Sequence, residues 1–256
     1  MNIESIWQHD HAYFGTISRI SPRDGYVIYT NPSLANRYDP NHAGLFRMRD
    51  DQVQNALEDI EHFFYSLDMD AVVYLDAHAT PASLDGALHE AGFVKKSEWG
   101  SSDLMTQQAA IPPYDQSIQV DVALNHDDFL RWCSVNQPDP YSPEDLMHKL
   151  HYQTVSAPGV NGYMAIVDGR PVARCVSFIK DGLGRVESVF VEESYRRRGL
   201  AYALVGRALH DIAAQGALGY LFAVHEAPAL ALYHKLGLRT VLTEAVYPYV
   251  KPYAEM

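Results

Sequence analysis

The sequence predicts an α/β fold, built on a mixed sheet with helices packed on it. Two observations predict it. Residues 117–250 alternate strand-like apolar runs with helical apolar spacing, in the order βααβββαβαβ. Residues 74–98 resemble residues 221–244, since each segment holds a strand, a loop with proline, a helix that ends at glycine and another strand. Either the chain carries an internal repeat at domain scale, or two ordinary α/β segments use the same unit.

The composition is that of a globular protein and narrows the function classes. Of 256 residues, 47% are hydrophobic and 20% charged, and no apolar run reaches the roughly 18 residues of a membrane span. The formal net charge of -12 argues against a protein that binds nucleic acid or an anionic membrane. The N-terminal residues have neither a basic region nor an apolar core, so we expect no secretory signal. Cys133 and Cys175 indicate free thiols and a cytoplasmic location.

The first half contains two predicted strands and two predicted helices. Apolar residues three or four positions apart predict the first helix, and a short apolar run predicts the strand after it. Thr80 before Pro81 predicts the start of the second helix, and Gly92 predicts its end. The predicted elements are a strand at 24–31, a helix at 48–67, a strand at 71–76 and a helix at 80–93.

A change of composition separates the two halves. Residues 106–117 are small and polar and include the consecutive prolines Pro112 and Pro113, which fit neither a helix interior nor a central strand. We therefore expect an N-terminal domain at 1–110, a linker at 111–117 and a C-terminal domain at 118–256.

The second half supplies the longer series of elements. Ser142, Pro143 and Asp145 form a capping arrangement at the start of its second helix. Asp168-Gly169 and the glycine-rich residues 181–184 predict hairpins that join three strands. The predicted elements are a strand at 117–124, helices at 126–136 and 142–156, three strands within 162–191, a helix from about 199, a strand at 219–226, a helix at 227–237 and a strand at 238–250.

Three consecutive arginines, Arg196, Arg197 and Arg198, stand between a predicted strand and a predicted helix. Gly199 follows them and allows a ligand to approach the backbone where a Cβ would block it. The first turn of a helix offers unpaired N–H groups and a partial positive charge. Together these features predict a turn that binds phosphate, and the alternative is a solvated basic turn.

Two motifs in this half resemble the signatures of the GNAT superfamily of N-acetyltransferases. Residues 196–201 (RRRGLA) are similar to its pyrophosphate loop, Arg/Gln-x-x-Gly-x-Gly/Ala, and the V-x-x-x-Y-R that begins at Val191 also fits, with Glu193 at the usual proline. Residues 229–238 (ALALYHKLGL) are similar to A-x-x-L-Y-x-K-x-G-F, with Leu238 in place of phenylalanine. The resemblance covers most of residues 117–256, where the order of elements also matches.

The resemblance implies the GNAT fold, a mostly antiparallel central sheet flanked by helices, here as two such domains in tandem. It implies an enzyme that transfers an acetyl group from acetyl-CoA directly to a primary amine of a small-molecule or peptide acceptor. It implies no metal. We expect no nucleic-acid or membrane partner, and a monomer or homodimer.

The resemblance also implies roles for individual residues. Tyr233 stands at the position of the general acid, and the alternative is a core tyrosine. Glu187 stands where related enzymes often carry a carboxylate that acts as a base directly or through water, and the alternative is an ordinary exposed strand glutamate. Glu226 stands where the family often has asparagine. The residues expected to bind the cofactor are Val189, Phe190, Val191, Arg196, Arg197, Arg198, Gly199, Leu200, Ala201 and Glu226.

The N-terminal half lacks the residues that carry these roles. No Arg-x-x-Gly-x-Gly/Ala motif precedes Leu88, which stands where Tyr233 stands in the other half. We therefore expect a degenerate GNAT-like domain there. The alternative function for the whole chain is a protein that senses acetyl-CoA, or binds a partner, without turnover. The histidine pairs His9/His11 and His148/His151 have no ligand set at recognisable spacing and are expected to be structural or surface residues.

Overall fold

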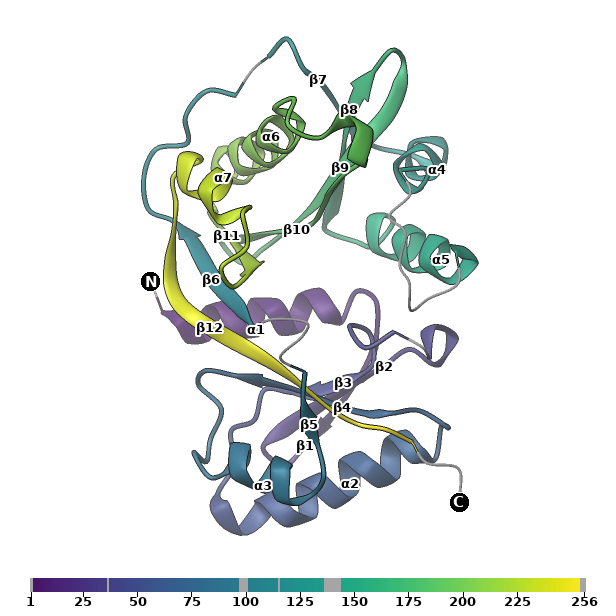
Figure 1. Cartoon of the computed structure of the whole chain (residues 1–256), viewed down its shortest axis with the longest axis vertical. Helices are drawn as coiled ribbons and strands as arrows, with labels where there is room; N and C mark the ends of the chain where they lie inside the picture. The colour runs from purple at the N-terminus through teal and green to yellow at the C-terminus, as the bar shows by residue number, and fades with distance from the viewer. Residues whose placement is uncertain (1, 36, 97–100, 115, 136–143, 254–256) are drawn as a thin grey trace. The chain divides into compact units, whose positions relative to one another are not determined.

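The computed structural model describes residues 2–35, 37–96, 101–114, 116–135 and 144–253 (Figure 1). The chain divides into an N-terminal unit, Met1–Asp103 with Leu242–Met256, and a C-terminal unit, Leu104–Val241. These divisions differ from the expected domains at 1–110 and 118–256 and the linker at 111–117. The last strand, β12 (Leu238–Lys251), pairs antiparallel with β4 (Ala71–Asp76) from Val246 to Lys251, and these hydrogen bonds place the C-terminal segment in the N-terminal unit.

In the N-terminal unit, strands β1 (Arg19–Arg23), β2 (Tyr26–Thr30) and β3 (His42–Gly44) form an antiparallel ribbon. Helix α2 (Val53–Tyr65) then connects β3 to β4, which run parallel at Ala43↔Val73. The strands and helices predicted from residue 24 to residue 93 are all present. The remaining elements of this unit are α1 (Ile3–Phe14), α3 (Leu84–Glu90) and β5 (Val94–Lys95), with short 3-10 turns at Pro32–Leu34 and Asp50–Gln52.

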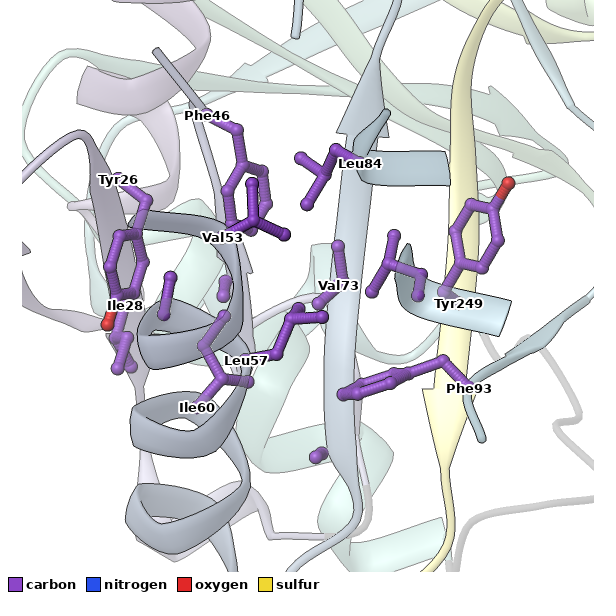
Figure 2. Close-up of a cluster of buried hydrophobic side chains, with 14 of the residues drawn as sticks. Tyr26, Ile28, Phe46, Val53, Leu57, Ile60, Val73, Leu84, Phe93 and Tyr249 are labelled. Carbon is purple, nitrogen blue, oxygen red and sulfur yellow. The ribbon is translucent and has the colours of Figure 1, made fainter. Parts of the chain in front are cut away.

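The core of this unit lies between α2 and the sheet. Leu57 and Ile60 of α2 face Val73 of β4, and Phe93 and Tyr249 close the same cluster (Figure 2). This arrangement follows from the helical apolar spacing and the short apolar strand read from the sequence.

Helix α3 begins at Leu84 and not at the expected Thr80-Pro81. The reason is that Thr80 is held in an extended backbone pairing. Its N–H donates to the Phe46 carbonyl (3.0 Å), and its own carbonyl accepts from the Met48 N–H (3.2 Å). The helix end is as expected, because Gly92 has φ +86 directly after it.

The C-terminal unit has the order βααβββαβαβ that the sequence predicts. The expected cap at Ser142 and Pro143 lies outside the described residues. The elements are β7 (Gln119–Ala123), α4 (His126–Cys133), α5 (Glu144–Val155), β8 (Val160–Val167), β9 (Arg170–Lys180), β10 (Leu183–Val191), α6 (Leu200–Ala214), β11 (Leu218–Val224), α7 (Leu230–Lys235) and the start of β12, preceded by β6 (Ser102–Gln107), of which residues 104–107 belong to this unit.

Both predicted hairpins are present. Asp168 and Gly169 have φ values of 51° and 77°, and Asp181 and Gly182 have φ values of 48° and 75°. Two consecutive left-handed residues form the type I′ turn that matches the twist of an antiparallel pair. These turns bring β8, β9 and β10 together in sequence order.

Helices cover both faces of these three strands. Helix α6 packs on one face, with Leu204, Ala208 and Ile212 in the cluster below it, and α4 and α5 lie on the other (Figure 1). Trp132 of α4 packs there on Val176 of β9. Within the described residues, no helix combines the length and the apolar character needed to cross a bilayer.

Candidate functional site

Strand β10 separates from its neighbour β11 halfway along its length. The two strands run parallel over three residue pairs, from Leu183↔Leu218 to Arg185↔Tyr220, although β10 extends to Val191 and β11 to Val224. On its other side, β10 stays paired with β9, with a shift of register between Glu187 and Phe190. Ser188 within this bulge has φ +56. A bulge bends a strand and increases its twist, so β10 diverges from β11 beyond Arg185.

This divergence leaves one edge of β10 without a described partner strand after the bulge. Val189, Phe190 and Val191 are all partly buried, and they lie on the part of β10 that the described pairing with β11 does not reach. Backbone N–H and C=O groups on this side of the strand can pair with an extended ligand, as an edge strand pairs with an added strand. Their expected role in binding the cofactor stays a prediction that this position permits.

The chain turns from β10 into α6 through the three arginines. Gly199 is the N-cap of α6 with φ +82, and no side chain caps the helix. The first N–H groups of this 15-residue helix therefore have no side-chain acceptor among the described residues. Leu200 is buried, so its backbone and not its side chain is available to a ligand. Gly199 is conformationally required, because φ +82 is a left-handed backbone that other residues adopt at a cost.

All three arginine side chains are exposed, and two of them donate to nearby backbone carbonyls. Arg196 Nε donates to the Val191 carbonyl (3.2 Å), and an Arg198 Nη atom donates to the Ser194 carbonyl (3.1 Å). Arg198 also lies over the Tyr195 ring, with 5.1 Å from guanidinium carbon to ring centroid. Among the described residues, none of the three arginines forms an ion pair with a carboxylate. Their charge adds to the partial positive charge of the α6 N-terminus, which favours a phosphate ligand.

Glu187 is part of the bulge, and its side chain is 30% exposed. Arg185 Nε donates to its Oε2 atom (3.0 Å), as does a terminal guanidinium nitrogen of the same arginine. The Ser188 N–H donates to Oε1 (3.0 Å). Both carboxylate oxygens are therefore engaged, so an amine or a water would reach Glu187 through the lone pairs that remain.

Tyr233 lies on α7 and is partly buried. Burial, and then the negative charge of Glu187, raise the pKa of its hydroxyl to about 12. The hydroxyl therefore carries its proton throughout the neutral range. No hydrogen-bond partner for it exists among the described residues. A protonated donor without a partner, close enough to Glu187 to respond to its charge, is available to a bound ligand.

Glu226 and Leu88 are two further residues singled out from the sequence, Glu226 by the family resemblance and Leu88 by the comparison of the two halves. Glu226 follows β11, and its side chain is 87% exposed with φ +58. Its carboxylate points to solvent and approaches His225 at 3.9 Å. In the N-terminal unit, Leu88 of α3 is fully buried, and a leucine side chain has no hydroxyl to donate to a ligand.

The N-terminal unit also differs at the start of its crossover helix. The turn that precedes α2 holds Asp50 and Asp51, whereas the turn that precedes α6 holds three arginines and Gly199. Asp50 accepts a hydrogen bond from Ser83 Oγ (2.6 Å), and Asp51 pairs with Arg49 (3.1 Å). Two carboxylates at a helix N-terminus repel a phosphate ligand.

Sequence reasoning did not include Arg174, which lies at the centre of β9. It is 0% exposed, and its Nη2 atom lies 2.8 Å from His151 Nε2. His151 is thus a structural histidine, as expected. A signal for Arg174 is present in the sequence, because it is the one charged residue inside the otherwise apolar or small run PVARCVSF.

Comparison with known proteins agrees with this geometry. Residues 126–238 match the model of the acetyltransferase (GNAT) family. This segment begins at α4 and ends after α7, so it contains β10, the arginine turn, α6 and Tyr233. No curated protein matches the sequence of the chain.

Solved structures share the fold over both units. A GCN5-related N-acetyltransferase from Kribbella flavida is similar with a TM-score of 0.73 and 18% identity, covering 98% of this chain and 95% of that one. A functionally unknown conserved protein from Staphylococcus epidermidis has a TM-score of 0.67 and 18% identity, covering 92% and 94%. A tandem GNAT protein from the clavulanic acid biosynthesis pathway has a TM-score of 0.59 and 10% identity, covering 84% and 76%.

Proposed function

From the GNAT acetyltransferase domain at residues 126–238, we propose that this protein transfers an acetyl group from acetyl-CoA to a primary amine. The C-terminal unit carries the reaction, and the N-terminal unit is a GNAT-like domain without a cofactor site. The observation that carries the proposal is the uncapped N-terminus of α6 with Gly199 at φ +82, placed directly after a strand that has separated from its neighbour.

In this proposal the pyrophosphate of the cofactor binds the first turn of α6, and Arg196, Arg197 and Arg198 supply the compensating charge. The pantetheine arm lies along residues 189–191 and pairs with their backbone. A backbone N–H of this segment donates to the oxyanion that develops on the thioester carbonyl.

The amine nitrogen attacks the thioester carbon, a C–N bond forms, and the C–S bond breaks as the oxyanion collapses. The nitrogen loses a proton to water or to Glu187, and Tyr233 donates to the departing sulfur. Full transfer from a hydroxyl with a pKa of about 12 to a thiolate with a pKa near ~8.5 is uphill, so the hydrogen bond itself supplies most of the stabilisation. Solvent then restores the proton on Tyr233.

A thiol-release assay with acetyl-CoA and a panel of amines tests the proposal. A protein that only senses acetyl-CoA would bind it, as calorimetry would show, but would release no thiol above the rate without protein. Amine-dependent thiol release, with the acetylated amine found by mass spectrometry, is the expected result. Absence of acetyl-CoA binding would overturn both functions.

A further inference from the structure

Arg174 is a fully buried arginine whose hydrogen-bonding capacity is mostly unused. Its Nη2 atom donates to His151 Nε2 at 2.8 Å, and its guanidinium carbon lies 4.4 Å from the centroid of the Trp132 ring. Its Nε and Nη1 atoms are buried and have no hydrogen-bond partner. A guanidinium offers five N–H donors in a fixed fork, so most of them are unmatched here.

The charge of Arg174 is also unmatched. Among the described residues no carboxylate contacts it; its Nη2 atom lies beside His151, and Cys133 interacts with it electrostatically. Burial lowers the pKa of its guanidinium to about 10, which still leaves it charged at neutral pH. A buried cation without an anion is costly, and a fork of free donors matches a carboxylate in shape and charge. These features indicate a place for an anion.

The position of Arg174 relates this place to the proposed reaction. Arg174 lies directly opposite Phe190 on β10, and Glu187 lies opposite Val176, two residues further along β9. Residues directly opposite on antiparallel strands share a face, so Arg174, Phe190 and Glu187 all lie on the face covered by α4 and α5. Two residues of strand span ~7 Å, the length of a small amino acid with its side chain.

We propose that Arg174 binds the carboxylate of the acceptor, so that the acceptor is a small amino acid or a similar molecule with a free amine and a carboxylate. This inference rests on the proposed function. The amine is directed towards residues 187–189, where the acetyl group is transferred, while the carboxylate occupies the free Nε and Nη1 donors. The guanidinium is 0% exposed and contacts the Trp132 ring and His151, so an acceptor reaches its free donors only when the covering side chains move, and a small acceptor requires the least movement.

The first test measures binding without turnover. The parent protein, in the presence of CoA, is titrated in a calorimeter with each of the proteinogenic amino acids and with β-alanine. Each amino acid that binds is then compared with its carboxamide. At least one amino acid is expected to bind, and its carboxamide about 10²-fold more weakly or not at all, because the carboxamide has lost the charge. Arg174→Met should abolish this preference. Arg131→Met is the control, since Arg131 lies on α4 with its own partners, Asp121 (3.7 Å) and Asp128 (3.6 Å).

Thermal unfolding shows that the Arg174 variant is folded. Because a buried, unpaired charge is replaced by an apolar side chain of similar length, Arg174→Met should melt at or above the parent's temperature in buffer without amino acids. Arg174→Lys keeps the charge but not the fork, and serves as the second variant if the first fails to fold. It should bind the amino acid more weakly than the parent does.

The second test measures turnover of the amino acid and its carboxamide. In Arg174→Met the KM for the amino acid should rise about 10²-fold. The KM for the carboxamide and the Kd of acetyl-CoA should stay near the parent's values. If carboxylates bind no better than carboxamides, or if Arg174→Met leaves the preference intact, the inference is wrong although the proposed function stands. If acetyl-CoA does not bind, the proposed function itself is wrong.

Discussion

Replacing Tyr233 by phenylalanine removes one hydroxyl from the proposed site. No hydrogen-bond partner for this hydroxyl exists among the described residues, and its pKa is raised to about 12, so its removal leaves no unsatisfied group behind. The melting temperature should therefore stay at the parent's value or rise slightly. Positioned proton donation is worth about 10²–10⁴ in rate, which corresponds to about 2.7–5.4 kcal/mol of transition-state stabilisation.

The assay is single-turnover acetylation of the best amine found, with the Kd of acetyl-CoA measured separately. The loss should appear in kcat and not in Kd, because the tyrosine acts on the departing sulfur. Tyr163→Phe is the matched control, since the Tyr163 hydroxyl is buried and bonded to Ser177 at 3.3 Å. It should cost about 1 kcal/mol of stability and leave kcat unchanged. A Tyr233→Phe enzyme as fast as the parent would refute the role given to this hydroxyl.

Other variants and conditions test the remaining parts of the account. Gly199→Val should lose acetyl-CoA binding, whereas Gly216→Val, at the opposite end of α6 with φ +71, suffers the same backbone strain of about 1–2 kcal/mol and should keep it, as calorimetry would show. The Kd of acetyl-CoA should rise with ionic strength, since exposed arginines bind the phosphates. Gly184→Ala should destabilise the fold by about 1–3 kcal/mol in urea titrations, because its Cβ would meet Ile212 side-chain atoms at 2.5–2.8 Å. Because the pKa of Tyr233 is raised from 10 to about 12, its contribution to the stability of the fold is fully present below pH 10 and should be lost as the pH rises towards 12. For the same reason, the pH profile of kcat should show no alkaline limb from Tyr233 between about pH 7 and 10.

The turns and the helix boundaries of the C-terminal unit could be predicted because local chemistry determines them. Asp168-Gly169 is a dipeptide that favours the type I′ turn, and Gly199 marks the start of α6 because its conformation is costly for other residues. Helix α1 was not predicted, although its sequence holds local signals: Asn2 accepts from the Glu4 N–H (3.1 Å), and Ile6, Trp7 and Tyr13 are buried on one side of the helix.

Other features depend on tertiary structure and have no local signal. Residues 238–250 have one continuous strand pattern, so nothing in it marks Leu242 as the point where β12 passes into the N-terminal unit. The bulge that separates β10 from β11 is formed at Ser188 with φ +56, although serine is an ordinary strand residue. Such a conformation is imposed by the surrounding structure, and sequence rules reserve it for glycine.

The candidate site was predictable in its residue types but not in its interactions. Gly199 lies at the N-terminus of α6 and Tyr233 lies on α7, as the predicted order of elements requires, and their roles stay predictions. The engagement of both Glu187 oxygens depends on Arg185 and on the bulge, and pairs of this kind do not follow from spacing. The burial of Arg174 without an anion is likewise a property of the assembled sheet and its two covering helices.

The central claim is that the C-terminal unit binds acetyl-CoA at the N-terminus of α6, and that the N-terminal unit, with Asp50 and Asp51 at the turn before α2, does not. A calorimetric titration of the full chain with acetyl-CoA tests this claim most directly. The account predicts one molecule bound per chain in the parent and none in Gly199→Val. Two molecules per chain, or undiminished binding by Gly199→Val, would contradict it.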